Sequence, residues 1–273
     1  MSQMTDTDEL KARDAFDMQS PLFDNLYKDN SIIQYKRDRV RECALQYLQP
    51  GDRILELNAG TGEDAVYFAE KGMHVHATDI SERMQDVLKK KVENYGLKGS
   101  ITTEICSFTN LSVLKDQGPY DLIFSNFGGL NCTSRLETVL LSFPGLVKPG
   151  GTIVLVIMPG FCFWETLLFL KGNFKSALRR FNSRNGASAQ IEGVKFKCWY
   201  YSPHFVVKAL RERFSLLSVE ALCSIVPPSY LESFPLKYPG IFKFLVRVEN
   251  EYKGKWPWKY IGDYYIISMK RDR

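Results

Sequence analysis

The chain has few of the residues from which metal centres and disulfide frameworks are built. It contains three histidines and six cysteines in 273 residues, with no C-x-x-C pair and no close Cys/His cluster. Structural zinc sites need such closely spaced ligands, and small secreted domains need dense disulfides. We therefore expect no metal site, and we expect reduced thiols, which are typical of a cytoplasmic protein.

Long apolar runs are also missing. No run approaches the roughly 20 residues that cross a bilayer, and the acidic start MSQMTDTDELKARDAF differs from the basic and then apolar order of a signal peptide. The formal net charge of +5 is small for this length and gives no reason to expect a nucleic-acid partner. These features favour a cytoplasmic protein, and they do not predict an oligomeric state.

Apolar strands alternate with helix-patterned segments along the chain, which is typical of a parallel α/β sheet. Helices are expected at 31–48 with Ser31 as N-cap, at 63–71, after Ser81 and after Ser202. Strands are expected at 53–57, 74–80, 101–108, 120–127, 152–158, 215–225 and 263–271, and a strand or extended edge is expected at 194–201. The first twenty residues have the composition of a mobile arm or an irregular helix, and the small, polar residues before 194 have that of a loop.

The residues from Ile54 to Gly72 have the pattern of a strand, a glycine turn and a helix. Glycines allow a backbone to approach a ligand closely, and a helix N-terminus offers unpaired N–H groups. Gly60, Gly62 and Ala65 fit the relaxed dinucleotide fingerprint G-x-G-x-x-A. On the turn alone, an NAD(P)-dependent oxidoreductase is therefore an open alternative.

The acid in the preceding strand changes this interpretation. Glu56 comes two residues before Asn58 and gives the order E-x-N-x-G-x-G, which resembles motif I, usually E/D-x-G-x-G-x-G, of the class I S-adenosylmethionine-dependent methyltransferases. The resemblance implies that S-adenosyl-L-methionine is the cofactor and that its methionine part faces Glu56, Asn58, Ala59, Gly60 and Gly62. Asn58 replaces the usual glycine, so either its backbone adopts a conformation that asparagine tolerates, or the turn differs locally from that of the family.

Two further motifs follow at the order and spacing of that family. Asp79 ends the second strand, where the family has an acid that binds both ribose hydroxyls, and Ile80 beside it is expected against the adenine. Ser107 and Phe108 fall where the family reads the adenine edge and stacks a side chain on its face. Cys106 or Ser107 replaces a frequent aspartate there, so a backbone carbonyl or Ser107 Oγ is expected to bind the adenine amino group.

The loop after the fourth strand, with Asn126 and Phe127, looks like the active-site loop of the family, and both residues are expected beside the cofactor. It lacks the D/N-P-P-Y/F tetrad of amino methyltransferases, which disfavours DNA N-methylation. Methyl transfer needs alignment and exclusion of water, and it needs a general base only if the acceptor holds its proton. The candidate catalytic residues are His204, Asn126 and Tyr200.

The resemblance covers residues 48–158 and implies an α/β fold. The expected sheet is doubly wound, seven-stranded and mostly parallel, in the order 3-2-1-4-5-7-6 with the last strand antiparallel, and it carries a helical cap. We expect one domain, residues 1–273. Its parts are a cap at 1–48, a cofactor-binding core at 49–159, a lid insertion at 160–194, and C-terminal strands with a helical insertion at 195–273.

Residues 161–184 begin apolar and aromatic and then become basic. This pattern favours a lid over the acceptor, with a membrane-surface contact as the alternative. The predicted function is S-adenosylmethionine-dependent methylation of a small, apolar or aromatic metabolite. The alternatives are an S-adenosylmethionine-binding enzyme or scaffold that does not methylate, a lipid methyltransferase at a membrane surface, and the oxidoreductase.

Overall fold

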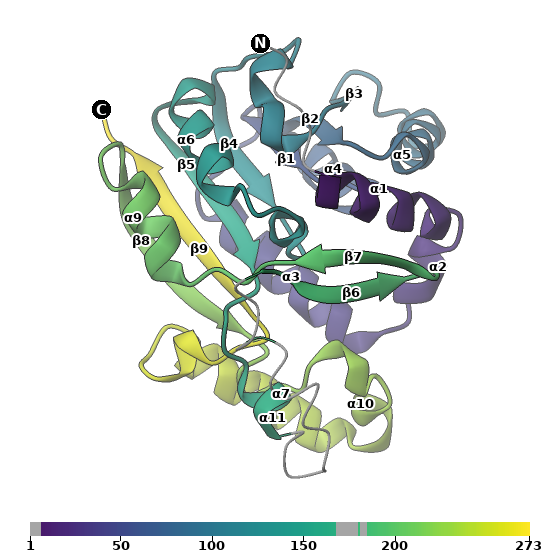
Figure 1. Ribbon diagram of the computed structural model, residues 1–273, viewed down its shortest axis with the longest axis vertical. Helices are drawn as coiled ribbons and strands as arrows, with labels where there is room; N and C mark the ends of the chain where they lie inside the picture. The colour runs from purple at the N-terminus through teal and green to yellow at the C-terminus, as the bar shows by residue number, and fades with distance from the viewer. Residues whose placement is uncertain (1–6, 168–179, 181–184) are drawn as a thin grey trace.

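A seven-stranded sheet forms the centre of the molecule (Figure 1), in a computed structural model that describes residues 7–167, 180 and 185–273. Its order is β3-β2-β1-β4-β5-β9-β8. The strands are β1 (Arg53–Leu57), β2 (His74–Asp79), β3 (Ile101–Ile105), β4 (Tyr120–Ser125), β5 (Val147–Ile157), β8 (Phe214–Leu222) and β9 (Tyr264–Arg271). Strands β1 to β5 pair in parallel, and β9 runs antiparallel to β5 and β8. Since β8 and β9 are the sixth and seventh strands of this sheet, the predicted order and antiparallel last strand are confirmed.

Helices cover both faces of the sheet, so it is doubly wound. Helices α3 (Ser31–Leu45), α4 (Glu63–Glu70) and α5 (Glu82–Asn94) pack on one face, and α6 (Leu136–Leu146) and α9 (Pro203–Leu210) pack on the other. Successive residues of a strand point to opposite faces. Ile54 of β1 accordingly joins the first layer, while Leu55 and Leu57 join the second. By the same alternation, Glu56 points to the layer that contains α3.

Further elements extend this core at both ends of the chain. Helices α1 (Thr7–Gln19) and α2 (Phe23–Tyr27) precede α3, and the short helices η1 (Phe108–Val113), η2 (Gly129–Cys132) and α7 (Phe163–Leu167) follow β3, β4 and β5. The insertion between β8 and β9 holds η4 (Ser229–Leu231), α10 (Phe234–Lys237), α11 (Pro239–Tyr252) and η5 (Trp258–Tyr260). In the described ranges, no helix combines the length and the apolarity that a membrane span requires.

Two segments differ from the sequence-based expectation. The start of the chain is a regular helix, α1, and the expected loop before residue 194 contains the strand β6 (Ala187–Ile191). β6 pairs with β7 (Val194–Cys198) in a hairpin outside the main sheet, and α1 lies beside this hairpin (Figure 1). Ala12 and Ala15 of α1 share a small core with Phe196 of β7. Alanines allow this close approach, but they contribute little to an apolar pattern. The sequence pattern therefore did not indicate which face of α1 is buried against the hairpin.

The N-caps expected at Ser81 and Ser202 are confirmed. Each hydroxyl accepts a hydrogen bond from the backbone N–H three residues later, at 3.0 and 3.2 Å. Ser31 is not the cap of α3. Asn30 takes that place, because its backbone is extended and its side-chain oxygen accepts from the N–H groups two and three residues later, both at 3.1 Å.

Much of the predicted lid or membrane contact at 161–184 lies outside the described residues, which include 161–167 and Arg180 of this segment. The buried guanidinium of Arg180 lies 2.8 Å from the carboxylate of Glu165 in α7 and 2.7 Å from that of Asp263. Lys36 of α3 lies 3.3 Å from the other oxygen of Asp263. These four residues, the Asp263 cluster, connect α3, α7 and the start of β9.

Candidate active site

A cavity lies beside the glycine turn that follows β1, between the sheet and α1. Ligands of open α/β sheets bind at the carboxyl ends of the strands, and β1, β2 and β4 end here. The cavity is lined by nine of the residues predicted to bind the cofactor: Glu56, Asn58, Ala59, Gly60, Asp79, Ile80, Phe108, Asn126 and Phe127. Gly62 and Ser107, the other two predicted residues, are not among its lining residues.

The turn after β1 is shaped by contacts that need small or flexible residues. Asn58 has φ 48°, a left-handed conformation that asparagine tolerates, which is the first of the two expected outcomes. Its amide donates to the Asn126 carbonyl at 3.1 Å, and its side-chain oxygen accepts from the Ser125 hydroxyl at 2.6 Å. A Cβ atom at Gly62 would lie 2.1 Å from the Leu88 side chain of α5. Gly62 therefore allows the turn to pack on α5.

Asp79 at the end of β2 is held by two backbone amides. Its two carboxylate oxygens accept from Gly60 N and Ser81 N, each at 2.8 Å. Burial raises the pKa of Asp79 to about 6, although these hydrogen bonds act in the opposite direction. The carboxylate is therefore mostly ionised at neutral pH, and each of its oxygens can accept a further hydrogen bond.

Glu56 of β1 and Arg37 of α3 bring two poorly satisfied charges to the cavity. Glu56 is 3% exposed, and burial raises its pKa well above the ordinary value. Among the described residues, its Oε2 atom and the Nε atom of Arg37 have no hydrogen-bond partner. The Arg37 guanidinium lies 3.5 Å from the Glu63 carboxylate and 5.1 Å from the Phe127 ring centroid. Buried charged atoms without partners are costly, so such atoms in a cavity indicate a ligand.

Asn126 is engaged in holding the loop after β4. Its amide donates to Asp64 at 2.8 Å, and its side-chain oxygen accepts from Phe127 N at 2.7 Å. Asp64 in turn accepts from Arg41 Nε at 2.7 Å. Phe127 has φ 51°, so this network fixes a strained loop conformation beside the cavity.

Helix α1 adds a carboxylate that the sequence analysis did not predict. Glu9 is 1% exposed, lines the cavity, and accepts from Ser107 Oγ at 2.7 and 2.8 Å and from Thr109 Oγ1 at 2.9 Å. The hydroxyl of Ser107, expected to bind the adenine, thus donates to Glu9. The spacing of Glu9, Ala12 and Phe16 on one helix face was the available signal. All three line the cavity.

The other two catalytic candidates lie elsewhere. His204 is exposed in the first turn of α9, and the ring of Tyr200 lies 5.1 Å from the Arg180 guanidinium. Neither lines the cavity. Asn126 is therefore the one catalytic candidate that the structure brings to the cavity.

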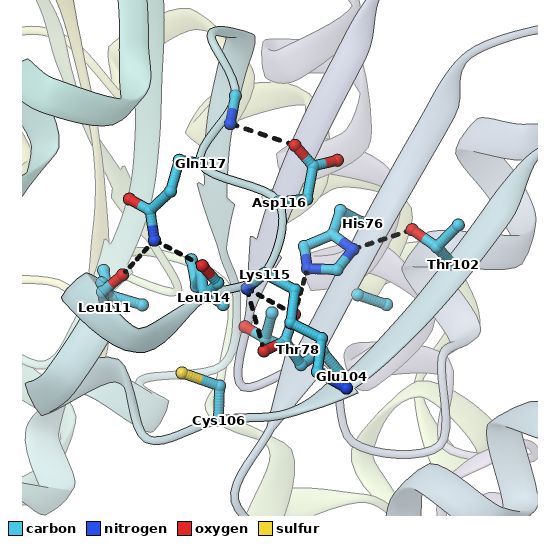
Figure 2. Close-up of polar contacts among 12 residues, drawn as sticks. His76, Thr78, Thr102, Glu104, Cys106, Leu111, Leu114, Lys115, Asp116 and Gln117 are labelled. Carbon is cyan, nitrogen blue, oxygen red and sulfur yellow. Dashed lines mark hydrogen bonds and ion pairs between the residues drawn. The ribbon is translucent and has the colours of Figure 1, made fainter.

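His76 is held at the β2–β3 edge of the sheet (Figure 2). Its Nδ1 atom lies 2.7 Å from the Thr102 hydroxyl, and its Nε2 atom lies 3.3 Å from the Glu104 carboxylate. Glu104 also accepts from Lys115 N at 3.2 Å. Burial lowers the pKa of His76, which favours a neutral ring at pH 7. These contacts indicate a structural role for this histidine.

Comparison with known proteins identifies the central part of the chain. Residues 54–151 match a family model described as a methyltransferase domain. The demethylmenaquinone methyltransferase of Listeria welshimeri is 27% identical over 159 residues, which are 56% of this chain and 64% of that protein. The chain thus spans less than two thirds of the length of this relative. An uncharacterized protein of Methanocaldococcus jannaschii is 25% identical over 209 residues, 75% of this chain and 76% of that protein.

Solved structures show the same fold at low identity. A putative S-adenosylmethionine-dependent methyltransferase from Listeria monocytogenes has a TM-score of 0.61 at 16% identity, covering 88% of this chain and 98% of that one. Magnesium protoporphyrin IX methyltransferase from Synechocystis, with bound S-adenosylhomocysteine, has a TM-score of 0.61 at 14% identity, covering 97% and 100%. Together, the sheet order and these structures show that the chain has the α/β fold of S-adenosylmethionine-dependent methyltransferases, and residues 54–151 match a methyltransferase domain.

Proposed function

We propose that this chain binds S-adenosylmethionine in the cavity beside the glycine turn and transfers its methyl group to a small-molecule acceptor. The observation that carries the proposal is that Glu56 and Arg37 line one cavity, and that each has a side-chain atom, Oε2 and Nε, without a hydrogen-bond partner among the described residues. A free amino acid has one ammonium and one carboxylate. Its ammonium would complete the hydrogen bonding of Glu56, and its carboxylate would complete that of Arg37.

The remaining lining residues suit a nucleoside. Asp79 has lone pairs available for the two ribose hydroxyls, which are hydrogen-bond donors. Ile80 and Phe108 provide apolar surfaces for a base. Glu9 supplies a carboxylate acceptor near Ser107, where the family often has an aspartate for the adenine amino group. We infer that the adenine edge is read by Glu9 from α1, and that Ser107 positions Glu9.

The bound cofactor supplies a methyl group on a positively charged sulfur, which an acceptor lone pair displaces. The chain supplies position and exclusion of water. Phe16 of helix α1 and Phe23 of helix α2 line the cavity. Asn126 holds the loop that presents Phe127. Among the described lining residues there is no histidine, lysine or tyrosine. An acceptor that must lose a proton would therefore have to use one of the lining carboxylates, whereas an acceptor atom with a free lone pair at neutral pH needs no general base.

A small, apolar or aromatic acceptor is supported by the aromatic lining of Phe16, Phe23 and Phe127. Similar proteins are named for demethylmenaquinone, 1,6-didemethyltoxoflavin and geranyl diphosphate, which are small molecules. The methyltransferase domain match favours this function over the oxidoreductase alternative.

The test is calorimetric titration with S-adenosylmethionine and S-adenosylhomocysteine, followed by detection of S-adenosylhomocysteine formed with a set of small aromatic acceptors. Binding that is lost in Asp79→Ala, together with acceptor-dependent turnover, supports the proposal. Binding without turnover across a broad acceptor set supports the alternative of a non-methylating S-adenosylmethionine-binding protein. The [4+2]-cyclase SpnF shares the fold at a TM-score of 0.54 and 16% identity, over 86% of this chain and 81% of that one. Absence of binding by the wild-type protein refutes the proposal.

A further inference from the structure

Helix α11 has apolar side chains on more of its circumference than the core covers. Phe242, Leu245 and Val246 pack against the body of the protein. Ile241 and Phe244 point elsewhere, since they are 52% and 60% exposed. The helix is therefore apolar on a buried side and on an adjacent outer side.

The outer apolar residues form one continuous stripe. At 3.6 residues per turn, Ile241, Phe244, Val248 and Tyr252 fall within about 80° of one another around the helix axis. Val248 is half-buried and Tyr252 is 36% exposed. The stripe thus runs along the whole length of α11, and we call it the α11 stripe.

Exposed apolar residues continue beyond both ends of the helix. Leu236 in α10 and Trp256 after α11 are each 79% exposed, and Tyr260 in η5 is 44% exposed. Figure 1 shows α10 and α11 together at the end of the molecule opposite α6. Soluble proteins seldom expose apolar side chains in such a concentration unless the surface binds something.

Basic side chains lie beyond one edge of the stripe. On the helical wheel, Arg247 is about 60° and Lys243 about 100° past Phe244 on the side away from the core, and the exposed Glu251 lies between Arg247 and the stripe. Exposed basic residues outnumber exposed acids over 230–260: Lys237, Lys243, Arg247 and Lys255 against Glu232 and Glu251. An apolar helix face with an aromatic residue at its end and lysine or arginine at its border is the pattern of a helix that lies in a membrane interface.

We propose that α10, α11 and residues 253–260 dock on a membrane surface rich in anionic lipids. The α11 stripe and Trp256 would enter the headgroup region, and the basic side chains beyond its edge would pair with lipid phosphates. A second copy of this chain is a poorer match, because two such surfaces in contact would bring like charges together. The proposal does not depend on methyl transfer, since none of these residues lines the cavity.

The test is flotation of the full chain with vesicles. Vesicles of equal parts phosphatidylcholine and phosphatidylglycerol should bind at least about tenfold more strongly than phosphatidylcholine alone, with less binding at high salt. Phe244→Ser and Trp256→Ser should each weaken binding by about tenfold, since each removes a large apolar side chain from the interface. Lys243→Glu with Arg247→Glu should remove the preference for anionic lipid.

Leu141→Ser is the matched control, because Leu141 is 61% exposed on α6 at the other end of the molecule. This variant should float like the wild type, and all variants should keep the wild-type melting temperature. Equal binding to neutral and anionic vesicles overturns the proposal, as does flotation that survives both Phe244→Ser and Trp256→Ser. Dimerisation that Phe244→Ser abolishes, without vesicle binding, would instead assign the stripe to a second copy.

Discussion

Glu56→Gln is expected to lower cofactor affinity while raising stability. The substitution keeps the size of the side chain and removes its charge. Because the carboxylate is proposed to bind the methionine ammonium, the variant should lose a charged hydrogen bond that contributes about 1.5–3 kcal/mol. The dissociation constant for S-adenosylmethionine should therefore rise about 10- to 150-fold, measured by calorimetry.

Stability should change in the opposite direction because the ionised carboxylate is buried. The pKa of Glu56 is raised in the folded protein, so folding favours the protonated form, and ionisation costs stability as the pH rises above the ordinary value of 4.5. Removing the charge should stabilise the ligand-free protein by about 1 kcal/mol at pH 7. The melting temperature should rise by about 2–4 °C, and this gain should vanish near pH 4, where the carboxyl is protonated in both states.

Glu249→Gln is the control for a buried glutamate with a structural role. Glu249 is 0% exposed, and its carboxylate accepts from the Tyr35 hydroxyl and from three backbone N–H groups. The NH2 group of a glutamine side chain would lie against hydrogen-bond donors, so the free energy of unfolding should fall by about 1–3 kcal/mol. The cofactor affinity should not change. If Glu56→Gln behaves like this control, the carboxylate supports the fold and its assignment to the methionine end is wrong.

Three further substitutions test other parts of the structure. Asp79→Ala should weaken S-adenosylmethionine binding about 100-fold or more, measured by calorimetry. Since burial raises the pKa of Asp79 to about 6, the affinity of the wild-type protein should also fall below that pH. An affinity that does not change with pH would contradict the proposed ribose role of Asp79. Glu9→Gln should reduce the preference for S-adenosylhomocysteine over S-inosylhomocysteine about tenfold in competition assays, whereas an unchanged preference would remove Glu9 from the adenine edge. Asp263→Ala removes the carboxylate that Lys36 and Arg180 share, which leaves Arg180 paired with Glu165, and it should cost about 3–5 kcal/mol in urea unfolding. Asp86→Ala is the control, because the ion pair of Asp86 with Lys89 is exposed, and its loss should lower the free energy of unfolding by less than about 1 kcal/mol.

The sheet and the glycine turn could be predicted because their signals are local. The strand, turn and helix around Gly60 occupy consecutive residues, and the acid that ends β2 follows at a fixed spacing. At Asn58, which replaces a glycine, one of the two expected outcomes was a backbone conformation that asparagine tolerates, and its φ of 48° is such a conformation. Local steric rules were sufficient to name this outcome.

The lining residues Glu9 and Arg37 could not be predicted, because their positions depend on tertiary packing. Glu9 meets Ser107 across 98 residues of sequence, and α1 reaches this place through alanines that give a weak pattern. Arg37 is buried in α3, an amphipathic helix. From the sequence alone, a charged residue in such a helix is assigned to the exposed face. Polar residues on the buried faces of these helices were the available signal.

Some lining residues of the cavity lie in the part of the chain that matches the methyltransferase domain, and others lie outside it. This difference predicts which residues select the acceptor. Glu56, Asp79 and Phe108 lie within 54–151, the part that matches the methyltransferase domain, whereas Glu9 and Phe16 lie outside it. In the proposed assignment, the matched part therefore provides the methionine, ribose and base surfaces, and the covering helices provide the rest of the cavity wall. Substitutions in α1 and α2 should accordingly change acceptor choice more than cofactor affinity, except at Glu9, which we propose to contact the adenine of the cofactor.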